Sequence, residues 1–336
     1  KPNTTEGMSR IQGKASVPAP PPPPTRSEIF LDLREEMRQF VIAIAQFGRQ
    51  YQQDFRIIAR GGLELLVKRD VMDFKRTSPA RTYIRSLDGL IAEGVFSKIH
   101  QPGISPSQEH QAKMLKFVKH AERNGIRIFT LDYGKSKKFI DKTYLEAQKQ
   151  GFVPMVSSKP LLDITSLPAY PQRPFRENSD NVLTPKQVLN FVAVTNSIAY
   201  GREDVFALKL HDTNYDMVIV DVFHGRQPLS RRAVETLKYK KVGAKRLVIA
   251  QMNIGLADSY KYYWEDNWGE GSPPFINAPL RNEPDRYYVK YWLPQWQQLI
   301  AGNTNSFLYG IIRQGFDGVL IDGLETYKFY ESGGEE

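Results

Sequence analysis

The chain has 336 residues, of which 41% are hydrophobic and 25% charged, a composition typical of a folded globular protein. It contains no cysteine, which excludes disulfides, zinc–thiolate sites and iron–sulfur clusters. The net charge is +9, but the basic residues are scattered along predicted helices, so we expect no nucleic-acid partner. No apolar run approaches the roughly 20 residues that cross a bilayer, and we expect no membrane span.

Residues 1–26 form a polar, proline-rich segment. Pro18 and Pro20–Pro24 favour a polyproline II spacer that holds a domain away from a cell envelope, with a disordered tail as the alternative. The first residue is Lys1 rather than a methionine, which indicates a processed N-terminus. Together with the absence of cysteine, this predicts a secreted or cell-envelope (periplasmic) protein.

From residue 27 to residue 336 we predict one domain in which short apolar strands alternate with amphipathic helices. In its first half, residues 27–158, strands are predicted at 55–59, 87–92, 126–131 and 152–157, and helices at 27–53, 63–68, 107–124 and 136–150. A proline-bearing connector, 159–187, leads to the second half, 188–330, with strands at 191–195, 217–220, 247–253 and 318–321 and helices at 203–210, 230–241 and 293–314. Eight such units predict a TIM-type (β/α)8 barrel; an open doubly wound sheet is the alternative.

Four of the predicted strands end in a carboxylate: Glu93, Asp132, Asp221 and Asp322. The carboxyl ends of parallel strands form the rim where α/β enzymes build their active sites. Any one of these acids has about even odds of being only a helix cap. Four of them from well-separated segments predict one acid-lined mouth, suited to general acid/base or nucleophilic carboxylate chemistry.

Several catalytic and ligand-binding motifs are absent from the sequence. There is no glycine-rich nucleotide loop, no His-Glu-x-x-His and no Gly-x-Ser-x-Gly. The histidines are dispersed, and His100, His110 and His120 lie on or beside a polar helix, where we expect them to face solvent. We therefore expect no cofactor, no bound metal and no serine nucleophile. We also expect the chain to be a monomer.

All four tryptophans lie in one aromatic-rich stretch between residues 253 and 296. Aromatic faces stack on the C–H surfaces of sugars while neighbouring polar groups read the hydroxyls. This stretch therefore predicts a sugar site, with a structural plug at the barrel rim as the alternative. The candidate substrate-binding residues in it are Asn253, Tyr260, Tyr263, Trp264, Tyr291 and Trp292.

Three segments of the chain resemble a family of bacterial and archaeal glycoside hydrolases related to the endo-α-1,4-polygalactosaminidases of glycoside hydrolase family 114. They are Gly255 to Trp264, Tyr288 to Trp292 and Gly315 to Asp322, and residues 37–49, 55–59 and 93–96 also have counterparts. The resemblance covers most of residues 28–165 and 190–330. Family members begin with the half that matches residues 191–330, so the resemblance implies a circular permutation. It also implies that the ends near Glu28 and Tyr330 lie close in space.

The resemblance implies cleavage of a polysaccharide, with an amino-sugar polymer of the galactosaminide type as one candidate. Asp322 would be the nucleophile or charge stabiliser and Glu93 the general acid/base. Asp132, Asp221 and Glu325 would bind hydroxyls or tune this pair.

The chain departs from the family pattern at the turn after its first strand. The family's Pro-Gln-Asn-Gly turn is Ala59-Arg60-Gly61-Gly62 here, which places a cation where relatives have an amide. Other departures are Leu256, where many relatives carry an acid, and Lys261, where they carry an arginine. Two outcomes are open: a glycosidase of altered specificity, or a catalytically inactive carbohydrate-binding barrel of the same family.

Overall fold

The structure, a computed structural model, describes residues 31–70, 72–73 and 75–334. The chain divides into Lys1–Asp32 and Leu33–Glu336, and every helix and strand described below belongs to the second unit. The predicted spacer at residues 1–26 and the first residues of the predicted helix at 27–53 lie outside the described part.

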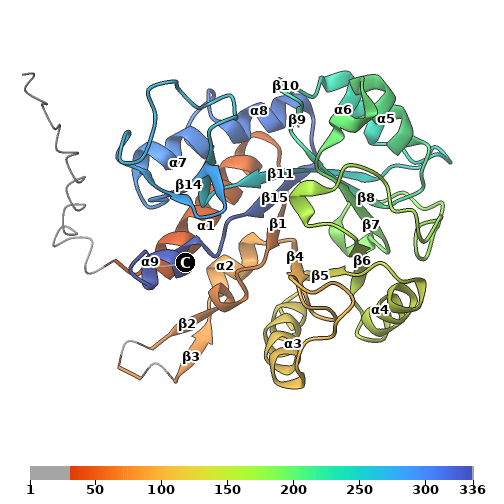
Figure 1. Cartoon of the computed structure of the whole chain (residues 1–336), viewed down its shortest axis with the longest axis horizontal. Helices are drawn as coiled ribbons and strands as arrows, with labels where there is room; N and C mark the ends of the chain where they lie inside the picture. Colours follow the sequence, from red (N-terminus) through yellow and green to blue (C-terminus); the bar gives the residue numbers. More distant parts are fainter. Residues whose placement is uncertain (1–30, 71, 74, 335–336) are drawn as a thin grey trace, which may run out of the picture. The chain divides into compact units, whose positions relative to one another are not determined.

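Eight parallel strands form one sheet whose spatial order is β6-β5-β4-β1-β15-β11-β8-β7. Each strand lies beside its neighbour in the chain, and the last strand, β15, pairs with the first, β1 (Figure 1). The edge strands β6 and β7 contact each other, so the sheet is a nearly closed TIM-like barrel, as predicted. The strands are β1 (Arg56–Arg60), β4 (Gly89–Glu93), β5 (Arg127–Tyr133), β6 (Val153–Ser157), β7 (Phe191–Val194), β8 (Met217–Asp221), β11 (Leu247–Asn253) and β15 (Gly318–Asp322).

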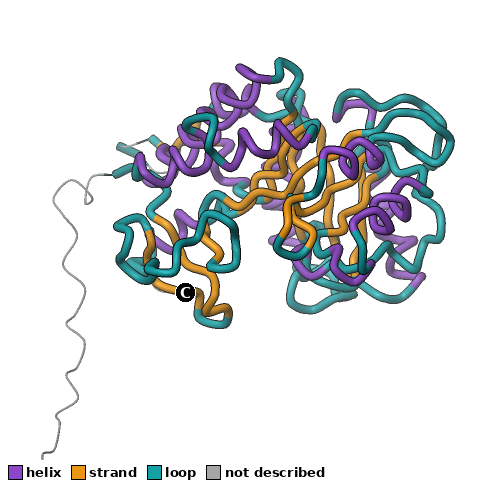
Figure 2. The backbone as a smooth tube through the Cα atoms, turned by 90° about the horizontal axis from the view of Figure 1, so that it is seen from above, coloured by secondary structure: helices purple, strands orange, loops and turns teal. Residues whose placement is uncertain are grey.

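Helices lie outside the strands of the barrel (Figure 2). They are α1 (Leu33–Tyr51), α2 (Arg81–Ser86), α3 (Gln108–Arg123), α4 (Lys137–Lys149), α5 (Glu203–His211), α6 (Arg231–Leu237), α7 (Pro294–Ala301), α8 (Phe307–Gln314) and α9 (Thr326–Glu331). Serine side chains cap the starts of α3, α4 and α6 by accepting backbone N–H groups. Within the described residues, we find no helix with both the length and the apolar character needed to cross a bilayer.

Two helix predictions are wrong in detail. The helix predicted at 63–68 is a single 3₁₀ turn, Leu63–Leu66, that leads into β2 (Val67–Arg69), which pairs with β3 (Thr77–Pro79). The helix predicted at 293–314 is two helices, α7 and α8. Gly302 ends the first, and the Ser306 hydroxyl accepts the Tyr309 amide to start the second. The glycine and the capping serine therefore divide the helix, although the apolar periodicity of the sequence continues across them.

Two insertions extend the carboxyl ends of β8 and β11. The first is a hairpin of β9 (Phe223–His224) and β10 (Gln227–Pro228). The second, predicted as an aromatic loop, is a three-stranded antiparallel sheet of β12 (Leu256–Asp258), β13 (Ile276–Leu280) and β14 (Glu283–Val289), with β14 in the centre. Both insertions leave the barrel at the end where TIM-barrel active sites lie.

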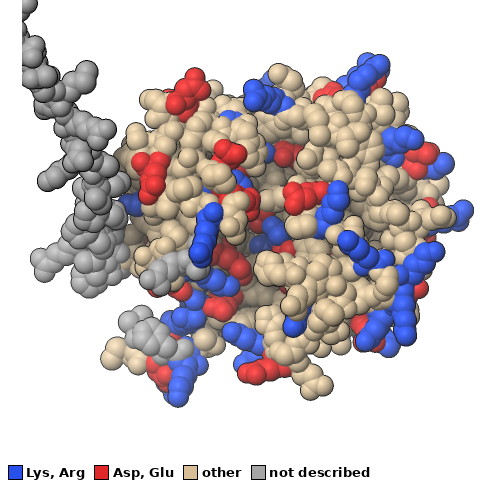
Figure 3. Space-filling view, in the orientation of Figure 1, with Lys and Arg blue, Asp and Glu red and all other residues tan. Residues whose placement is uncertain are grey.

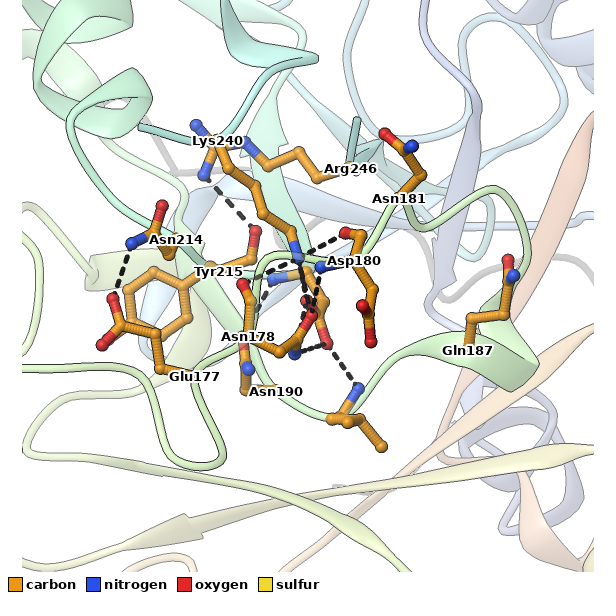
Figure 4. A network of polar contacts seen from close by, with 12 residues as sticks. Glu177, Asn178, Asp180, Asn181, Gln187, Asn190, Asn214, Tyr215, Lys240 and Arg246 are labelled. Atoms are coloured by element: carbon orange, nitrogen blue, oxygen red, sulfur yellow. Dashed lines mark hydrogen bonds and ion pairs between the residues drawn. The ribbon is translucent and has the colours of Figure 1, made fainter. Parts of the chain in front are cut away.

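The connector at 159–187 is irregular, with 3₁₀ turns at Leu161–Asp163 and Pro185–Gln187. Its anchor is Lys240, whose Nζ donates to Asp216 Oδ1 at 2.6 Å and to the connector carbonyl of Asp180 at 2.8 Å (Figure 4). The Lys240 and Asp216 side chains are fully buried. Because Asp216 immediately precedes β8, this ion pair ties the connector to the amino end of the barrel.

Candidate functional site

The order of strands places Arg60 between Glu93 and Asp322. β1 lies between β4 and β15, and each of the three residues ends its strand. Arg60 pairs with Ile91, two residues before Glu93, and Ala59 pairs with Ile321, directly before Asp322. Neighbours in register and residues two apart share one face of a sheet, so the three side chains point the same way.

Arg60 bridges the two carboxylates. Its Nη2 lies 2.7 Å from Glu93 Oε2 and its Nη1 lies 2.7 Å from Asp322 Oδ2. Burial lowers the pKa of Arg60, but the charges of Asp322 and Glu93 outweigh that effect and raise it above its ordinary value, so the guanidinium stays charged. Because one planar guanidinium spans both contacts, the two carboxylate oxygens lie within about 8 Å of each other.

Three further groups hold the carboxylates in place. The Tyr133 hydroxyl donates to Glu93 Oε1. Gln251 Nε2 and the Gly323 amide donate to Asp322 Oδ2 at 3.3 Å and Oδ1 at 2.8 Å. Burial and the charge of Glu93 raise the pKa of Tyr133, which keeps its hydroxyl a donor. Both oxygens of each carboxylate are therefore engaged.

A pocket of about 840 Å³ opens onto this cluster and is named the carboxylate pocket below. Its charged lining consists of Arg60, Glu93, Asp322, Glu325 and Lys328, with His100 beside them. Its apolar wall is formed by Leu256, Leu280, Tyr288 and Phe329, and the rings of the last two stack with centroids 3.7 Å apart. On the face seen in Figure 3, acidic and basic side chains are interspersed.

Asp132 also lies near the carboxyl end of a barrel strand, but it is outside the carboxylate pocket. Leu131 pairs with Glu93, so Asp132, one residue later, faces the opposite side of the sheet. Its Oδ1 accepts the amides of Phe96 at 2.7 Å and Ser97 at 2.9 Å, and its buried Oδ2 has no partner among the described residues. Burial raises the pKa of Asp132 to about 7. Asp132 holds the loop after β4.

The predicted aromatic residues separate into core and surface. Tyr263 and Tyr291 are buried, and the hydroxyl of Tyr291 donates to the Leu33 carbonyl at 2.7 Å. Trp264 stacks on Tyr287, and Trp292 packs against Tyr330 near the chain end. Tyr260, at 58% exposed, lines a second pocket together with Asp221. The stretch therefore contains both rings packed in the core and an exposed ring at a pocket.

Two other predicted residues have distinct positions. Asn253 Oδ1 accepts the amides of Gly255 and Leu256 at 3.0 and 2.8 Å, so this side chain shapes the turn after β11. Glu325 lines the carboxylate pocket and pairs with Lys328 at 3.0 Å.

Sequence reasoning missed Tyr133, Gln251, Tyr288 and Phe329, and noted Arg60 only as a departure from the family turn. The signal for Tyr133 was its spacing, since it lies two residues beyond Leu131 on the face of Glu93. In the described part of the chain, no group of three or more His, Asp or Glu side chains is arranged to hold a metal ion.

No known family model matches the chain. Its relatives include uncharacterized proteins of Methanocaldococcus jannaschii, 25% identical over 163 residues, Thermotoga maritima, 24% over 135, and Deinococcus radiodurans, 27% over 133. These matches cover 47%, 40% and 40% of this chain. They cover 45%, 40% and 40% of the respective relatives, so the chain spans less than half of the length of each.

Proposed function

We propose that the chain is a glycoside hydrolase that cleaves a polysaccharide with Asp322 and Glu93. The observation that carries this proposal is the meeting of these two carboxylates, from neighbouring parts of the barrel rim, in one accessible pocket. Their oxygens lie within about 8 Å of each other, no farther apart than the carboxyl groups of inverting glycosidases.

The contacts of each carboxylate support its proposed role. Asp322 accepts three donors, from Arg60, Gln251 and Gly323, which orient it as a nucleophile or as a stabiliser of positive charge on the sugar ring. Glu93 has fewer donors, Arg60 and Tyr133, and would give its proton to the leaving glycosidic oxygen.

The lining of the carboxylate pocket suits a sugar ring, with the Tyr288 and Phe329 wall opposite polar groups. Three carboxylates and two cations line it, a small acidic excess in a chain whose net charge is +9. This local charge supports an amino-sugar polymer of the galactosaminide type. Such a substrate fits the predicted location outside the cytoplasm.

The test is a product assay on exopolysaccharides, including α-1,4-linked galactosaminoglycan. Glu93→Gln and Asp322→Asn should each lower the rate of hydrolysis at least about 100-fold, because each removes a group that acts on the reacting bond. Glu109→Gln and Asp54→Asn, exposed carboxylates outside the pocket, are the matched controls. Unchanged rates in both pocket variants would refute the assignment.

A second candidate is a catalytically inactive carbohydrate-binding barrel. The Arg60 bridge between Glu93 and Asp322 favours it. Arg60 occupies the space between the carboxylates and neutralises part of their charge. The two candidates differ in the variant Arg60→Gln, which restores the amide of the family's turn. A blocked site should gain hydrolysis in this variant, whereas an active site that uses Arg60 to orient Asp322 should lose about 10-fold or more.

A further inference from the structure

A second pocket, of about 760 Å³, lies at the carboxyl ends of β7 and β8 and under the segment that follows β12. It is named the distal pocket below. Three aromatic side chains line it: Phe223, Tyr260 and Tyr262. Tyr260 and Tyr262 are 58% and 52% exposed, which is unusual for large rings that line a hollow. The Ser197 hydroxyl and His224 Nδ1, 2.8 Å apart, hold two of its loops together.

The distal pocket has a small acidic excess: its lining carries four carboxylates and three cations, which are Asp163, Asp221, Asp266 and Glu283, and Arg226, Lys261 and Arg286. Lys261 Nζ lies 3.1 Å from Asp221 Oδ2, and its ammonium lies over the ring of Tyr260 at 5.8 Å. Arg286 Nη1 lies 2.8 Å from Glu283 Oε2, and its Nε lies 2.8 Å from Asp258 Oδ1. A pocket with a small acidic excess and exposed rings suits a polar ligand that stacks and offers hydroxyls, rather than a phosphate or another anion.

The two pockets share one wall. In the small antiparallel sheet, Leu256 pairs with Tyr288, and both line the carboxylate pocket. Two residues further along, Asp258 pairs with Arg286, which lines the distal pocket. Residues two apart share a face and lie about 7 Å apart along a strand, so the pockets follow each other along this wall.

The main sheet gives a second connection between the pockets. Asp221, in the distal pocket, pairs in register with Gln251. Gln251 in turn donates to Asp322 in the carboxylate pocket. One strand, β11, lies between the strands of Asp221 and Asp322, so two inter-strand spacings, about 10 Å across the sheet, separate them.

We propose that the distal pocket is a glycan subsite, in which Tyr260 stacks on a sugar unit two or more positions away from the bond cleaved between Glu93 and Asp322. This inference rests on the proposed function and adds a second contact with the substrate, away from the bond that is cleaved. A short oligosaccharide would fill the carboxylate pocket alone, whereas a longer one would also reach Tyr260.

The test compares α-1,4-linked galactosamine oligosaccharides of three and eight units, with Tyr260→Ala as the variant. Loss of one stacking ring should lower kcat/KM for the octamer about 3- to 10-fold and leave the trimer within twofold. Tyr51→Ala, an exposed tyrosine on α1 outside both pockets, is the matched control and should change neither value. Equal losses on both lengths, or no loss on the octamer, would overturn the subsite.

A binding measurement separates this inference from the proposed function. Calorimetry of the octamer on Glu93→Gln, with and without Tyr260→Ala, should show a 3- to 10-fold weaker Kd in the double variant. Weaker binding without any hydrolysis by the wild-type chain would support the subsite and refute the glycosidase. Hydrolysis with an unchanged Kd would refute the subsite alone, and no octamer binding would refute both.

Discussion

The carboxyl group of Asp132 makes the loop after β4 sensitive to pH. It accepts two loop amides through one oxygen, while burial leaves the other without a partner in the described structure. Burial raises its pKa from 3.8 to about 7. Between these values the folded chain keeps a proton that the unfolded chain has lost, so the free energy of unfolding falls as pH rises through this window and stays low above it.

We therefore predict that Asp132→Asn removes part of the pH dependence of stability. Each pKa unit corresponds to about 1.4 kcal/mol, so up to about 4 kcal/mol would be lost between pH 4 and pH 7 in the wild type and not in the variant. Urea unfolding at several pH values measures this difference. Asp54→Asn, an exposed carboxylate, should keep the wild-type profile, and the same profile in Asp132→Asn would contradict the prediction.

The sequence predicted those residues of the candidate site that end a strand. Glu93 and Asp322 end apolar runs, and the order of elements brings those runs to one rim. The bridge by Arg60 and the displacement of Asp132 could not be predicted, because both depend on strand register. A shift of one residue moves a side chain to the other face of a sheet, and apolar runs such as residues 126–131 carry no alternation to mark the register.

Among the elements, the connector is held in place by a buried ion pair between residues outside it. Lys240 and Asp216 are fully buried and 2.6 Å apart, and Asp216 Oδ2 also accepts the Leu189 amide at 2.7 Å. Removing one partner of such a pair leaves the other charge buried and uncompensated. The connector would then lose its main attachment to the amino end of β8.

We predict that Lys240→Met lowers the free energy of unfolding by about 3–5 kcal/mol. Lys241→Met is the matched control, because its side chain is 61% exposed and pairs with Asp212 on the surface; it should cost about 1 kcal/mol or less. The urea midpoint reports both changes. Adding Asp216→Asn to Lys240→Met should recover part of the loss, and an unaltered midpoint in Lys240→Met would count against the anchor.

Element boundaries were predicted well where a cap or a glycine marks them. Ser107 and Ser136 start their helices as predicted, and Gly315 ends α8 with a positive φ. The three-stranded sheet of the aromatic insertion could not be predicted, because its pairing is set by packing. Tyr263 is buried and Tyr260 is exposed. Both are tyrosines of the same segment, so residue type alone does not distinguish buried from exposed rings.

At the scale of the whole molecule, the barrel has two seams, one between β15 and β1 and one between β6 and β7, and they differ in strand pairing. β15 and β1 are joined by a ladder of four paired residues, whereas β6 and β7 contact each other without a ladder in the described structure. Arg34 of α1 lies 2.7 Å from Glu331 of α9, so the start of the barrel unit contacts its end. Glu28 lies outside the described residues, so the predicted proximity of Glu28 and Tyr330 remains a prediction.

The family resemblance implies an exchange of halves in this chain. In the family's order of elements, the chain ends would lie at the seam between β6 and β7, which the connector spans here. The permuted order nevertheless stays a proposal, and a barrel with two adjacent ends offers a direct way to test it.

We predict that the chain tolerates a second relocation of its ends. In the variant, residue 334 is joined to residue 33 by a short glycine–serine linker, and the connector is opened between residues 171 and 172, which leaves Asn178 and Asp180 attached to Lys240. Because residues 172 and 173 are exposed and the cut leaves the anchored part of the connector in place, the urea midpoint should correspond to a loss of no more than about 2 kcal/mol. The same joined chain opened between Ala250 and Gln251, inside β11, should not fold. If the connector-opened chain also fails to fold, the seam between β6 and β7 is not a natural position for chain ends, and the permuted order loses its structural support.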